Sequence, residues 1–484
     1  MSAFLNAILD FTNWIWGLPM LLAIVGGGLF LSVRLRFLQF RRLPFILKNT
    51  IMKSIGQKGK NGKFSGWQAV TGALASTLGA GNIIGTAMAI AFGGPGGVFW
   101  LWVAGFAACI VKYSEVTLAM KFRHLDENGK WVGGPQYYLS EATGWKWLSI
   151  AYSIACVICM FLAASAQIGS SVDNIVTFGF GRMAVTIALT ILCALVVVGG
   201  MRNLLSVSEK VVPVMSVLYI AGALAVIIIN IQVLPEVFIS IFSHAFTGHA
   251  AAGGFGGAAV AACIRWGVCR GIYSNDAGVG YVTIAHSVAD VNHPVQQGMW
   301  GVFEVFFDTL VVCSMTCMAI LCTGVWQWEG VTAATMTAAA FSSALGTVGG
   351  VIVTVCLAMF TFTTACAQIE FGCATLSRLI GSIGRYGRWI MLGLIFCGGI
   401  VGIEALINYL DFALFLTIFF NLIGVYRSSG EVVEATEEYF ADTGRWESEK
   451  WPKWAAMTAA YEAKTITEDG GIVYEMSADY RNHS

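Results

Sequence analysis

The chain has 484 residues, of which 57% are hydrophobic and 12% charged, and its mean hydropathy is +0.72. Soluble domains carry about twice that share of charged residues, so the composition excludes an ordinary soluble protein. Basic and acidic residues balance at 28 each, and this zero net charge does not by itself indicate any partner.

Long uncharged apolar runs recur along the chain, each close to the ~20 residues that a membrane-spanning helix needs. They predict an all-α polytopic membrane protein with eleven transmembrane helices. The predicted spans are 13–32, 67–91, 96–120, 147–169, 183–201, 211–230, 257–288, 299–323, 348–371, 388–406 and 409–426. The first is not interpreted as a cleaved signal peptide, because no basic residue precedes it and no cleavage site follows it.

Basic residues are concentrated in the connections on one side of the predicted membrane. The connection 34–63 alone holds nine lysines and arginines. Because basic connections stay in the cytoplasm, the N-terminus is expected outside and the C-terminus inside. The polar, mostly acidic segment 427–484 is interpreted as a cytoplasmic tail, partly helical, and as a solvated appendage more than a docking or regulatory element.

The ten helices after the first divide into two halves of five. The predicted domains are 1–66 (N-terminal helix and basic loop), 67–230 and 257–426 (the two halves) and 427–484 (the tail). Since five is odd, the halves run in opposite directions and form an inverted repeat. Each half opens with a helix interrupted by glycine, serine and asparagine, as "STLGAGNIIG" and as "RGIYSNDAGVG".

Paired interruptions at matching places of two inverted halves predict the binding site of a transporter. Unwound backbone at membrane depth is tolerated only beside protein or a water-filled cavity. Helix-start amides near Gly81 and Asn82 can face an anionic group, and carbonyls from Ala75 to Leu78 can coordinate a hard cation. For any single glycine, close helix packing is the simpler interpretation, but the two matching interruptions favour a site for a zwitterion and an alkali cation.

Four motifs, "GAGNIIGTAMAIAFGGPGGVFWLWVAGF", "KYSEVTLAMKFR", "GGPQYYL" and "RGIYSNDAGVGYVTIAH", together resemble the alanine or glycine:cation symporter family over residues 13–426. The resemblance implies the leucine-transporter-type fold, with two discontinuous helices in a five-plus-five inverted repeat after one extra N-terminal helix. It also implies a secondary transporter of the bacterial plasma (inner) membrane that imports small neutral amino acids with sodium (Na+), and no enzyme activity.

The resemblance further implies roles for individual residues. The substrate would contact Gly79, Gly81, Asn82, Gln167, Gly271, Ser274, Asn275 and Thr364. The sodium ligands would be the carbonyls of Ala75 and Leu78 and the hydroxyls of Thr363 and Thr364. The alternative for each threonine is a hydrogen bond to a carbonyl of its own helix.

The chain departs from the family pattern after "TFTTA", where bulky aromatic residues are common and "CAQIEFG" stands instead. Gln368 is therefore added to the predicted substrate-binding residues. Ala164 replaces a common phenylalanine and Gly169 a familiar asparagine. These changes predict a roomier or more polar pocket, so glutamine joins alanine and glycine as a candidate substrate.

Charged side chains at membrane depth are costly and are functional candidates. Lys112 and Glu115 lie at i, i+3 and are expected to form a structural or gating bridge. Arg270 is expected to pair with Asp276 or Glu115 and close the cytoplasmic gate.

Three further carboxylates lie at this depth. Glu304 and Asp308 share one helix face and should look into the bundle. Glu370 is interpreted as lying near the ion site, where burial would make it a proton carrier. A proton-coupled symporter using Glu370 is thus the alternative to sodium coupling.

Other function classes fit less well. No filter loop or ring of like charges indicates a channel, and no nucleotide motif indicates an ATP-driven pump. No catalytic or metal-ligand cluster of cysteine or histidine indicates an enzyme. A transporter-like amino-acid sensor remains an alternative; the expected partners are a neutral amino acid, sodium and membrane lipid, without nucleic acid.

Overall fold

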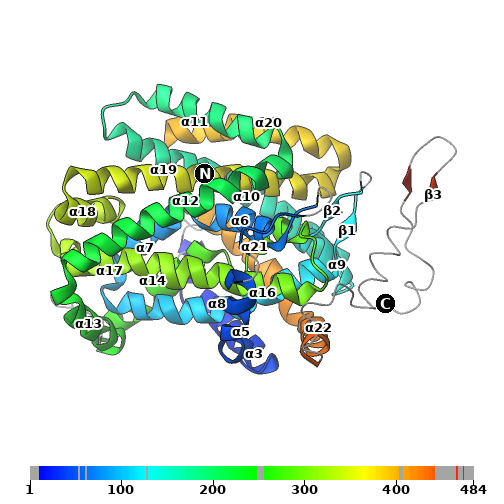
Figure 1. The fold of residues 1–484 in the computed structure, drawn as a ribbon, viewed down its shortest axis with the longest axis horizontal. Coiled ribbons are helices and arrows are strands. Elements are labelled where there is room, and N and C mark those ends of the chain that lie inside the picture. Colours follow the sequence, from blue (N-terminus) through cyan, green and yellow to red (C-terminus); the bar gives the residue numbers. More distant parts are fainter. Residues whose placement is uncertain are drawn as a thin grey trace.

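The computed structural model describes residues 10–12, 14–52, 55–59, 63–126, 129–247, 256–402, 407–441, 465–466 and 472–473. Helices make up nearly all of this part of the chain (Figure 1). Two short antiparallel ladders join β1 (His124–Leu125) to β2 (Trp131–Val132) and β3 (Thr465–Ile466) to β4 (Ile472–Val473).

The first part of the chain, to residue 233, holds the N-terminal helices and the first predicted half. Its helices are α2 Leu18–Leu21, η1 Leu22–Gly26, α3 Gly27–Arg34, α4 Leu38–Arg41, α5 Leu43–Leu47, η2 Lys48–Met52, α6 Gly66–Thr77, η3 Gly81–Gly85, α7 Thr86–Gly93, α8 Gly96–Lys121, α9 Pro135–Glu141, α10 Lys146–Val176, α11 Arg182–Val197, α12 Gly200–Ile229 and η4 Ile231–Val233.

The second part holds the second predicted half and the start of the tail. Its helices are α13 Leu234–Thr247, α14 Gly256–Asn275, α15 Thr283–Ser287, α16 Pro294–Val305, η5 Phe306–Cys313, α17 Ser314–Thr323, η6 Val325–Gln327, α18 Ala333–Leu345, α19 Thr347–Ile380, η7 Gly381–Tyr386, α20 Gly387–Val401, α21 Ile407–Arg427 and α22 Ser429–Ala441.

Helix occupies each of the eleven predicted spans, but fewer meet the length and apolarity of a membrane-spanning helix. Among the described residues six do, one of them the continuous run α16–η5–α17, and α6 with η3–α7 forms a seventh, bent span. The chain is therefore a multi-pass membrane protein, while the count of eleven and the division into inverted repeats stay predictions. The apolar helices α13 and α18 fall between the predicted spans and were not expected.

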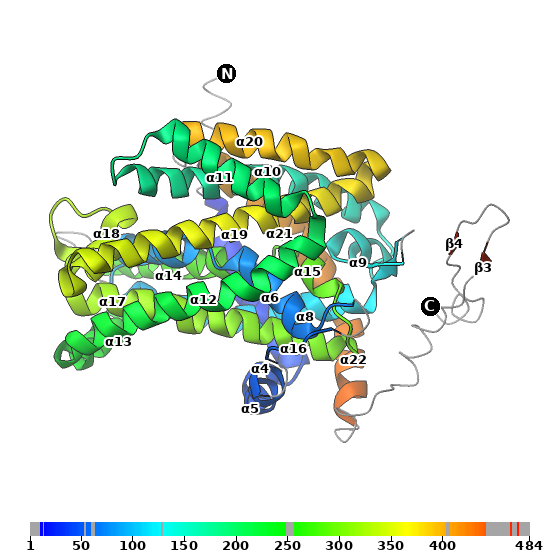
Figure 2. The same ribbon diagram turned by 45° about the horizontal axis from the view of Figure 1, so that its top comes forward.

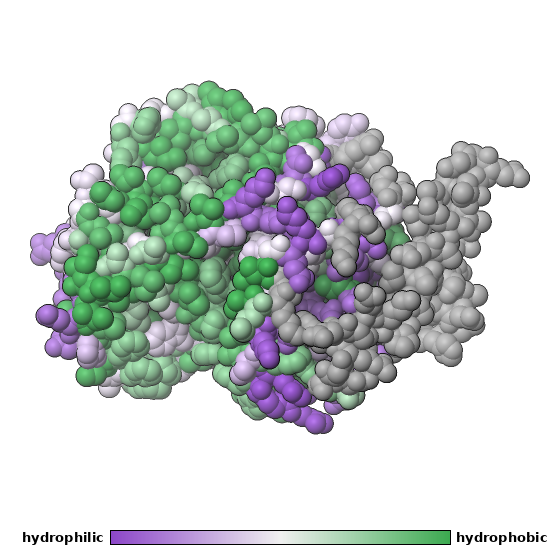
Figure 3. Space-filling view, in the orientation of Figure 1, coloured by the Kyte–Doolittle hydropathy of each residue, from purple (hydrophilic) through white to green (hydrophobic). Residues whose placement is uncertain are grey.

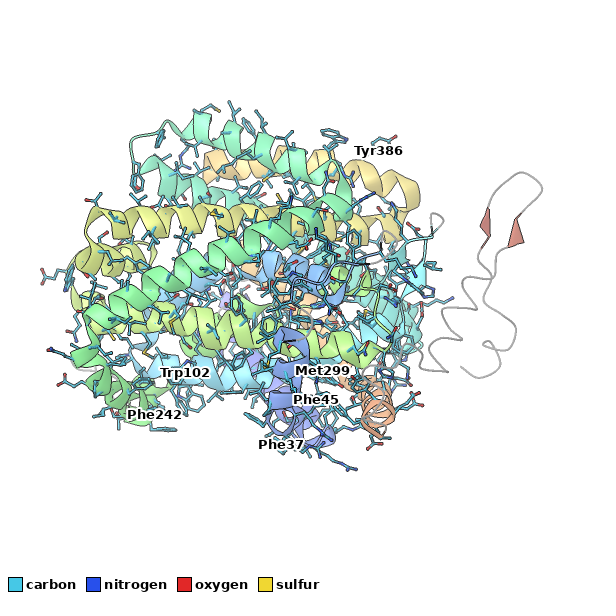
Figure 4. The ribbon with its side chains drawn as sticks, viewed as in Figure 1. Phe37, Phe45, Trp102, Phe242, Met299 and Tyr386 are labelled. Atoms are coloured by element: carbon cyan, nitrogen blue, oxygen red, sulfur yellow. The ribbon has the colours of Figure 1, made fainter. Side chains whose placement is uncertain are left out.

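The surface confirms that much of the bundle is built to face lipid. Large apolar side chains point outward from α11, α12 and α13, among them Leu195, Val217 and Ile239. Figure 3 shows one broad hydrophobic face, with hydrophilic residues gathered toward the end that carries β1, β2 and α22. Phe242 of α13 lies beside Trp102 of α8, with ring centroids 6.3 Å apart (Figure 4).

The start of the predicted tail is a helix attached to the bundle. Helix α22 packs against α8, α16 and α3 at one end of the molecule (Figure 2). Its buried face carries Val432, Ala435, Thr436 and Tyr439, and the Thr436 hydroxyl lies 2.7 Å from the Tyr113 hydroxyl of α8. The interpretation as a solvated appendage is therefore wrong for residues 429–441. The other residues of the predicted tail that lie outside the described part of the chain are 442–464, 467–471 and 474–484.

Candidate functional site

The first interruption is a real break in a helix. Helix α6 begins at a capping box formed by Ser65 and Gln68 and ends at Thr77. The chain then bends by 58° before η3–α7 continues. Since carbonyls at a helix end have no partner within the helix, the break leaves backbone oxygens available.

The Thr364 side chain of α19 faces two of these oxygens. Its hydroxyl oxygen lies 3.1 Å from the carbonyl oxygen of Ala75 and 3.0 Å from that of Leu78. All three residues are buried. The structure thus brings together three of the four predicted sodium ligands, and a set of oxygen donors is the kind that a hard cation prefers.

Thr363, the fourth predicted ligand, lies differently. Its hydroxyl donates to the Phe360 and Met359 carbonyls of its own helix, at 3.0 and 3.1 Å, and lies 3.8 Å from Met215 Sδ. Among the described residues, the Thr363 hydroxyl has no hydrogen bond to an α6 carbonyl. The alternative of a bond back to its own helix is the one the structure contains.

A small cavity opens beside this cluster. Both helix breaks line it, together with α10, α19 and α21. The lining residues are Ser76, Thr77, Gly79, Gly81, Cys159, Ala163, Gln167, Tyr273, Asp276, Tyr281, Gln368, Leu410 and Leu414. Of the predicted substrate-binding residues, Gly79, Gly81, Gln167 and Gln368 line this cavity directly.

Unsatisfied polar atoms mark this cavity as a place for a polar ligand. Within the described part of the chain, Ser76 Oγ, Thr77 Oγ1 and Gln368 Oε1 are buried without a hydrogen-bond partner. Buried polar groups are nearly always hydrogen-bonded, so three such atoms on or beside one cavity are consistent with a ligand that completes them.

The glycines of the first break allow the close approach of other side chains. A Cβ atom on Gly79 would lie 3.0 Å from Thr364 Oγ1 and 3.1 Å from Gln167 Nε2. Gln167 also accepts a hydrogen bond from the Ala80 amide at 3.2 Å. Glycine therefore permits this close approach, because a side chain would press on both Thr364 Oγ1 and Gln167.

Asn82 and Ser274 lie behind the cavity, where they join the two breaks. The Asn82 side chain accepts from the Gly79 amide at 2.9 Å and donates to Ser274 Oγ at 2.9 Å and to Asp308 Oδ1 at 2.6 Å. Ser274 in turn donates to Asp308 Oδ2 at 2.7 Å. All three residues are buried and none of them lines the cavity, so they hold the two breaks together from behind the binding site.

Asn275 and Gly271 also lie outside the cavity lining. Asn275 donates to Thr309 Oγ1 at 2.9 Å and accepts from the Ala277 amide at 2.9 Å, which fixes the start of the second break. A Cβ on Gly271 would lie 3.3 Å from Ala104, so this glycine serves the packing of α14 against α8.

The buried charges form pairs other than the predicted ones. Lys112 Nζ lies 3.4 Å from Glu304 and donates to the Asp276 carbonyl at 3.2 Å. Glu304 also contacts His286 Nε2 at 2.8 Å. Glu115 instead accepts from the Asn421 amide, so the predicted bridge between Lys112 and Glu115 is wrong. Burial of Glu304 and Asp308 inside the bundle is confirmed.

Arg270 lies on α14 before the second break, and its neighbours differ from those expected. Its guanidinium lies 5.1 Å from the Trp266 ring centroid and 5.5 Å from that of Tyr273. Within the residues that the structure describes, no ion pair joins Arg270 to Asp276 or Glu115. The predicted partners of the gate are therefore not its neighbours in this structure.

Glu370 does not line the cavity. It follows Gln368 by two residues, and at about 100° per residue it points to nearly the opposite side of α19. There it pairs with Arg388 of α20 at 3.5 Å. The position near the ion site, on which the proton-carrier alternative depended, is not found.

The sequence reasoning did not identify several residues of the site. Tyr273 and Tyr281 flank the second break, and Leu410 and Leu414 line the cavity from α21. Asp308 was placed in the bundle but not against the breaks. An aromatic residue on each side of "SNDAGVG" was the available signal for the two tyrosines, while nothing local distinguishes the leucines from other apolar residues of that span.

Known proteins provide the remaining comparison. The model of the sodium:alanine symporter family matches residues 1–452. The sodium/alanine symporter AgcS of Methanococcus maripaludis is 34% identical over 446 residues, which cover 90% of this chain and 97% of that protein. An uncharacterized transporter of Bacillus subtilis, YflA, is 38% identical over 91% of this chain and 94% of its own length.

Two more distant similarities complete the comparison. The probable sodium/glutamine symporter GlnT of Bacillus subtilis is 29% identical over 91% of each chain. A crystal structure of a mutant manganese transporter from Eremococcus coleocola superposes with a TM-score of 0.47 and 9% identity, over 84% of this chain and 86% of that one, which is too weak to identify a shared fold. The family match covers nearly the whole chain, so this protein belongs to the sodium:alanine symporter family and is a membrane transporter of the symporter class.

Proposed function

We propose that this symporter imports a small neutral amino acid together with sodium by alternating access. The observation that carries the proposal is the cluster of Thr364 Oγ1 with the carbonyl oxygens of Ala75 and Leu78, at 3.0–3.1 Å, directly beside the cavity. A cation at these oxygens would lie next to the substrate and would hold the end of α6 against the middle of α19. This arrangement supports sodium as the coupled ion, with Thr364 rather than Thr363 as the hydroxyl ligand.

The cavity supports an amino-acid zwitterion as substrate. The backbone at Gly81 lines the cavity at the start of η3–α7, where helix-start amides favour an anion such as a carboxylate. Asp276 is the acidic side chain among the lining residues and suits the ammonium group. Gln167 and Gln368 offer neutral polar contacts, which favour alanine, glycine or glutamine over a charged amino acid.

The orientation is proposed from the basic residues. The connection 34–63 is strongly basic, so the N-terminus is placed outside and the C-terminus in the cytoplasm of the bacterial inner membrane. A reporter enzyme active only in the cytoplasm, fused after residue 484, should be active; inactivity would reverse the proposed orientation.

The experiment is uptake of radiolabelled alanine, glycine and glutamine into proteoliposomes under an imposed sodium gradient or an imposed proton gradient. Concentrative uptake with sodium alone is expected. Thr364→Val keeps the shape of the side chain but removes one of three clustered oxygens, and sodium-driven uptake should fall at least tenfold, since a contact to a charged group contributes about 1.5–3 kcal/mol.

Thr363→Val is the matched control, because the Thr363 hydroxyl bonds to its own helix. It should retain uptake within about threefold of the wild type, as expected for a loss under 1 kcal/mol. Uptake driven by protons alone, or equal loss in both variants, would contradict the sodium assignment to this cluster.

A further inference from the structure

A second small cavity lies next to the first one. Its walls come from the residues before α2, from the part of α14 before the break and from the start of α21, and include Trp16, Trp266, Arg270, Tyr273 and Asp411. Tyr273 lines both cavities. Tyr273 therefore lies where the two cavities meet.

The second cavity holds opposite charges that do not neutralise each other by contact. Arg265, Arg270 and Asp411 all line it, and Arg270 lies within electrostatic range of Asp411. Yet the ion pairs of the described residues, taken to 4.0 Å, do not include this pair. Arg270 Nε is buried without a hydrogen-bond partner among those residues, and the guanidinium lies 5.1 Å from the Trp266 ring centroid and 5.5 Å from that of Tyr273.

We propose that this second cavity is an approach site for a zwitterionic α-amino acid, with Arg270 receiving the carboxylate and Asp411 the ammonium group. The inference rests on the proposed function, because it takes the same substrate class for the same pathway. A guanidinium binds a carboxylate through two parallel hydrogen bonds, and the Trp16 and Trp266 rings provide apolar surface for the substrate side chain. A guanidinium and a carboxylate that line one cavity match a ligand that carries both charges.

Tyr273 connects this approach site to the first cavity, which the two helix breaks line. Its ring packs on the first break, since a Cβ on Gly81 would lie 3.4 Å from Tyr273 Cδ1. The next residue, Ser274, is bonded to Asn82 and Asp308. A movement of Tyr273 that admits the amino acid is thus linked through the backbone to the residues that join the two breaks.

The test measures KM and kcat of sodium-driven alanine uptake for the wild type, Arg270→Gln and Asp411→Asn. Each substitution removes one charge contact, so KM should rise about tenfold while kcat stays within about twofold. Arg182→Gln is the matched control, because Arg182 pairs with Asp173 and does not line either cavity; its KM should not change.

Each outcome decides the proposal. Unchanged KM with lower kcat in both variants would make Arg270 and Asp411 a gate without a ligand, and would overturn the approach site alone. Absence of amino-acid uptake by the wild type would overturn the proposed function and this inference together. If Arg270→Gln does not fold, Arg270→Lys takes its place; it keeps the charge but lacks the planar fork, so its KM should still rise. A wild-type KM in both Arg270→Lys and Asp411→Asn would refute the site.

Discussion

Asp308→Asn tests how the two helix breaks are joined. The carboxylate accepts three hydrogen bonds, from Asn82 at 2.6 Å, Ser274 at 2.7 Å and Thr309 at 2.9 Å. Asparagine keeps the shape but presents an NH₂ group in place of one oxygen, so at least one of the three donors faces another donor. A lost hydrogen bond to a charged group costs about 1.5–3 kcal/mol, which corresponds to a fall in kcat/KM of about 10- to 100-fold.

The assay is sodium-driven uptake, with the amount of folded protein in the liposomes measured separately. Asp173→Asn is the control, because it neutralises a half-exposed carboxylate paired with Arg182, and such pairs contribute about 1 kcal/mol or less. If kcat/KM of Asp308→Asn lies within about threefold of the wild type, the carboxylate does not join the two breaks.

Two further substitutions test the oxygen cluster and the buried charges. Gly79→Ala would place a Cβ 3.0 Å from Thr364 Oγ1 and should lower sodium-driven uptake at least about fivefold, because overpacking costs about 1–3 kcal/mol. Gly393→Ala is the control: a Cβ there meets open space, so uptake should not change. Equal loss of uptake in both variants would refute crowding of the oxygen cluster as the cause. Lys112→Met leaves the fully buried Glu304 carboxylate without its ammonium partner and should lower the stability of the purified protein by about 3–5 kcal/mol. Adding Glu304→Gln should restore most of that loss in a thermal unfolding measurement, and a double variant no more stable than the single one would contradict the pairing.

The breaks and the oxygen cluster could be predicted because their signals are local. Glycine, serine and asparagine in an uncharged apolar run mark unwound backbone wherever the run lies in the fold. The carbonyls of Ala75 and Leu78 follow from the end of α6. The choice between Thr363 and Thr364 could not be made from the sequence, because it depends on how α19 is rotated about its axis. That rotation turns the Thr364 hydroxyl toward α6, while the Thr363 hydroxyl donates to a carbonyl of its own helix.

The polar residues of the second break show where local signals fail. Ser274 and Asn275 stand in the interrupted segment and so resemble cavity residues. Their side chains turn instead to Asp308 and Thr309 of η5. A carboxylate on a neighbouring helix determines this direction, and a single sequence does not state which helices are neighbours.

The attachment of α22 had a signal that charge obscured. Val432, Ala435, Thr436 and Tyr439 recur at helical spacing, which is the pattern of one buried face. The acidic residues between them made the segment resemble a solvated tail. Lys121 pairs with Glu431 and Glu434 at 2.7 and 3.0 Å, so part of that acidity serves the contact with α8.

Coupling requires that ion and substrate favour the same arrangement of the protein, because each can shift a conformational equilibrium only by its difference in affinity for the two states. Gly79 is the point where this condition can be met. The carbonyl oxygens of Ala75 and Leu78, which precede Gly79 in the chain, face the Thr364 hydroxyl. Gly79 itself lines the cavity, and its amide donates to Asn82, which reaches the second break. A cation that orders the end of α6 would therefore order the backbone that receives the amino acid, and by reciprocity the amino acid would strengthen binding of the cation by the same factor.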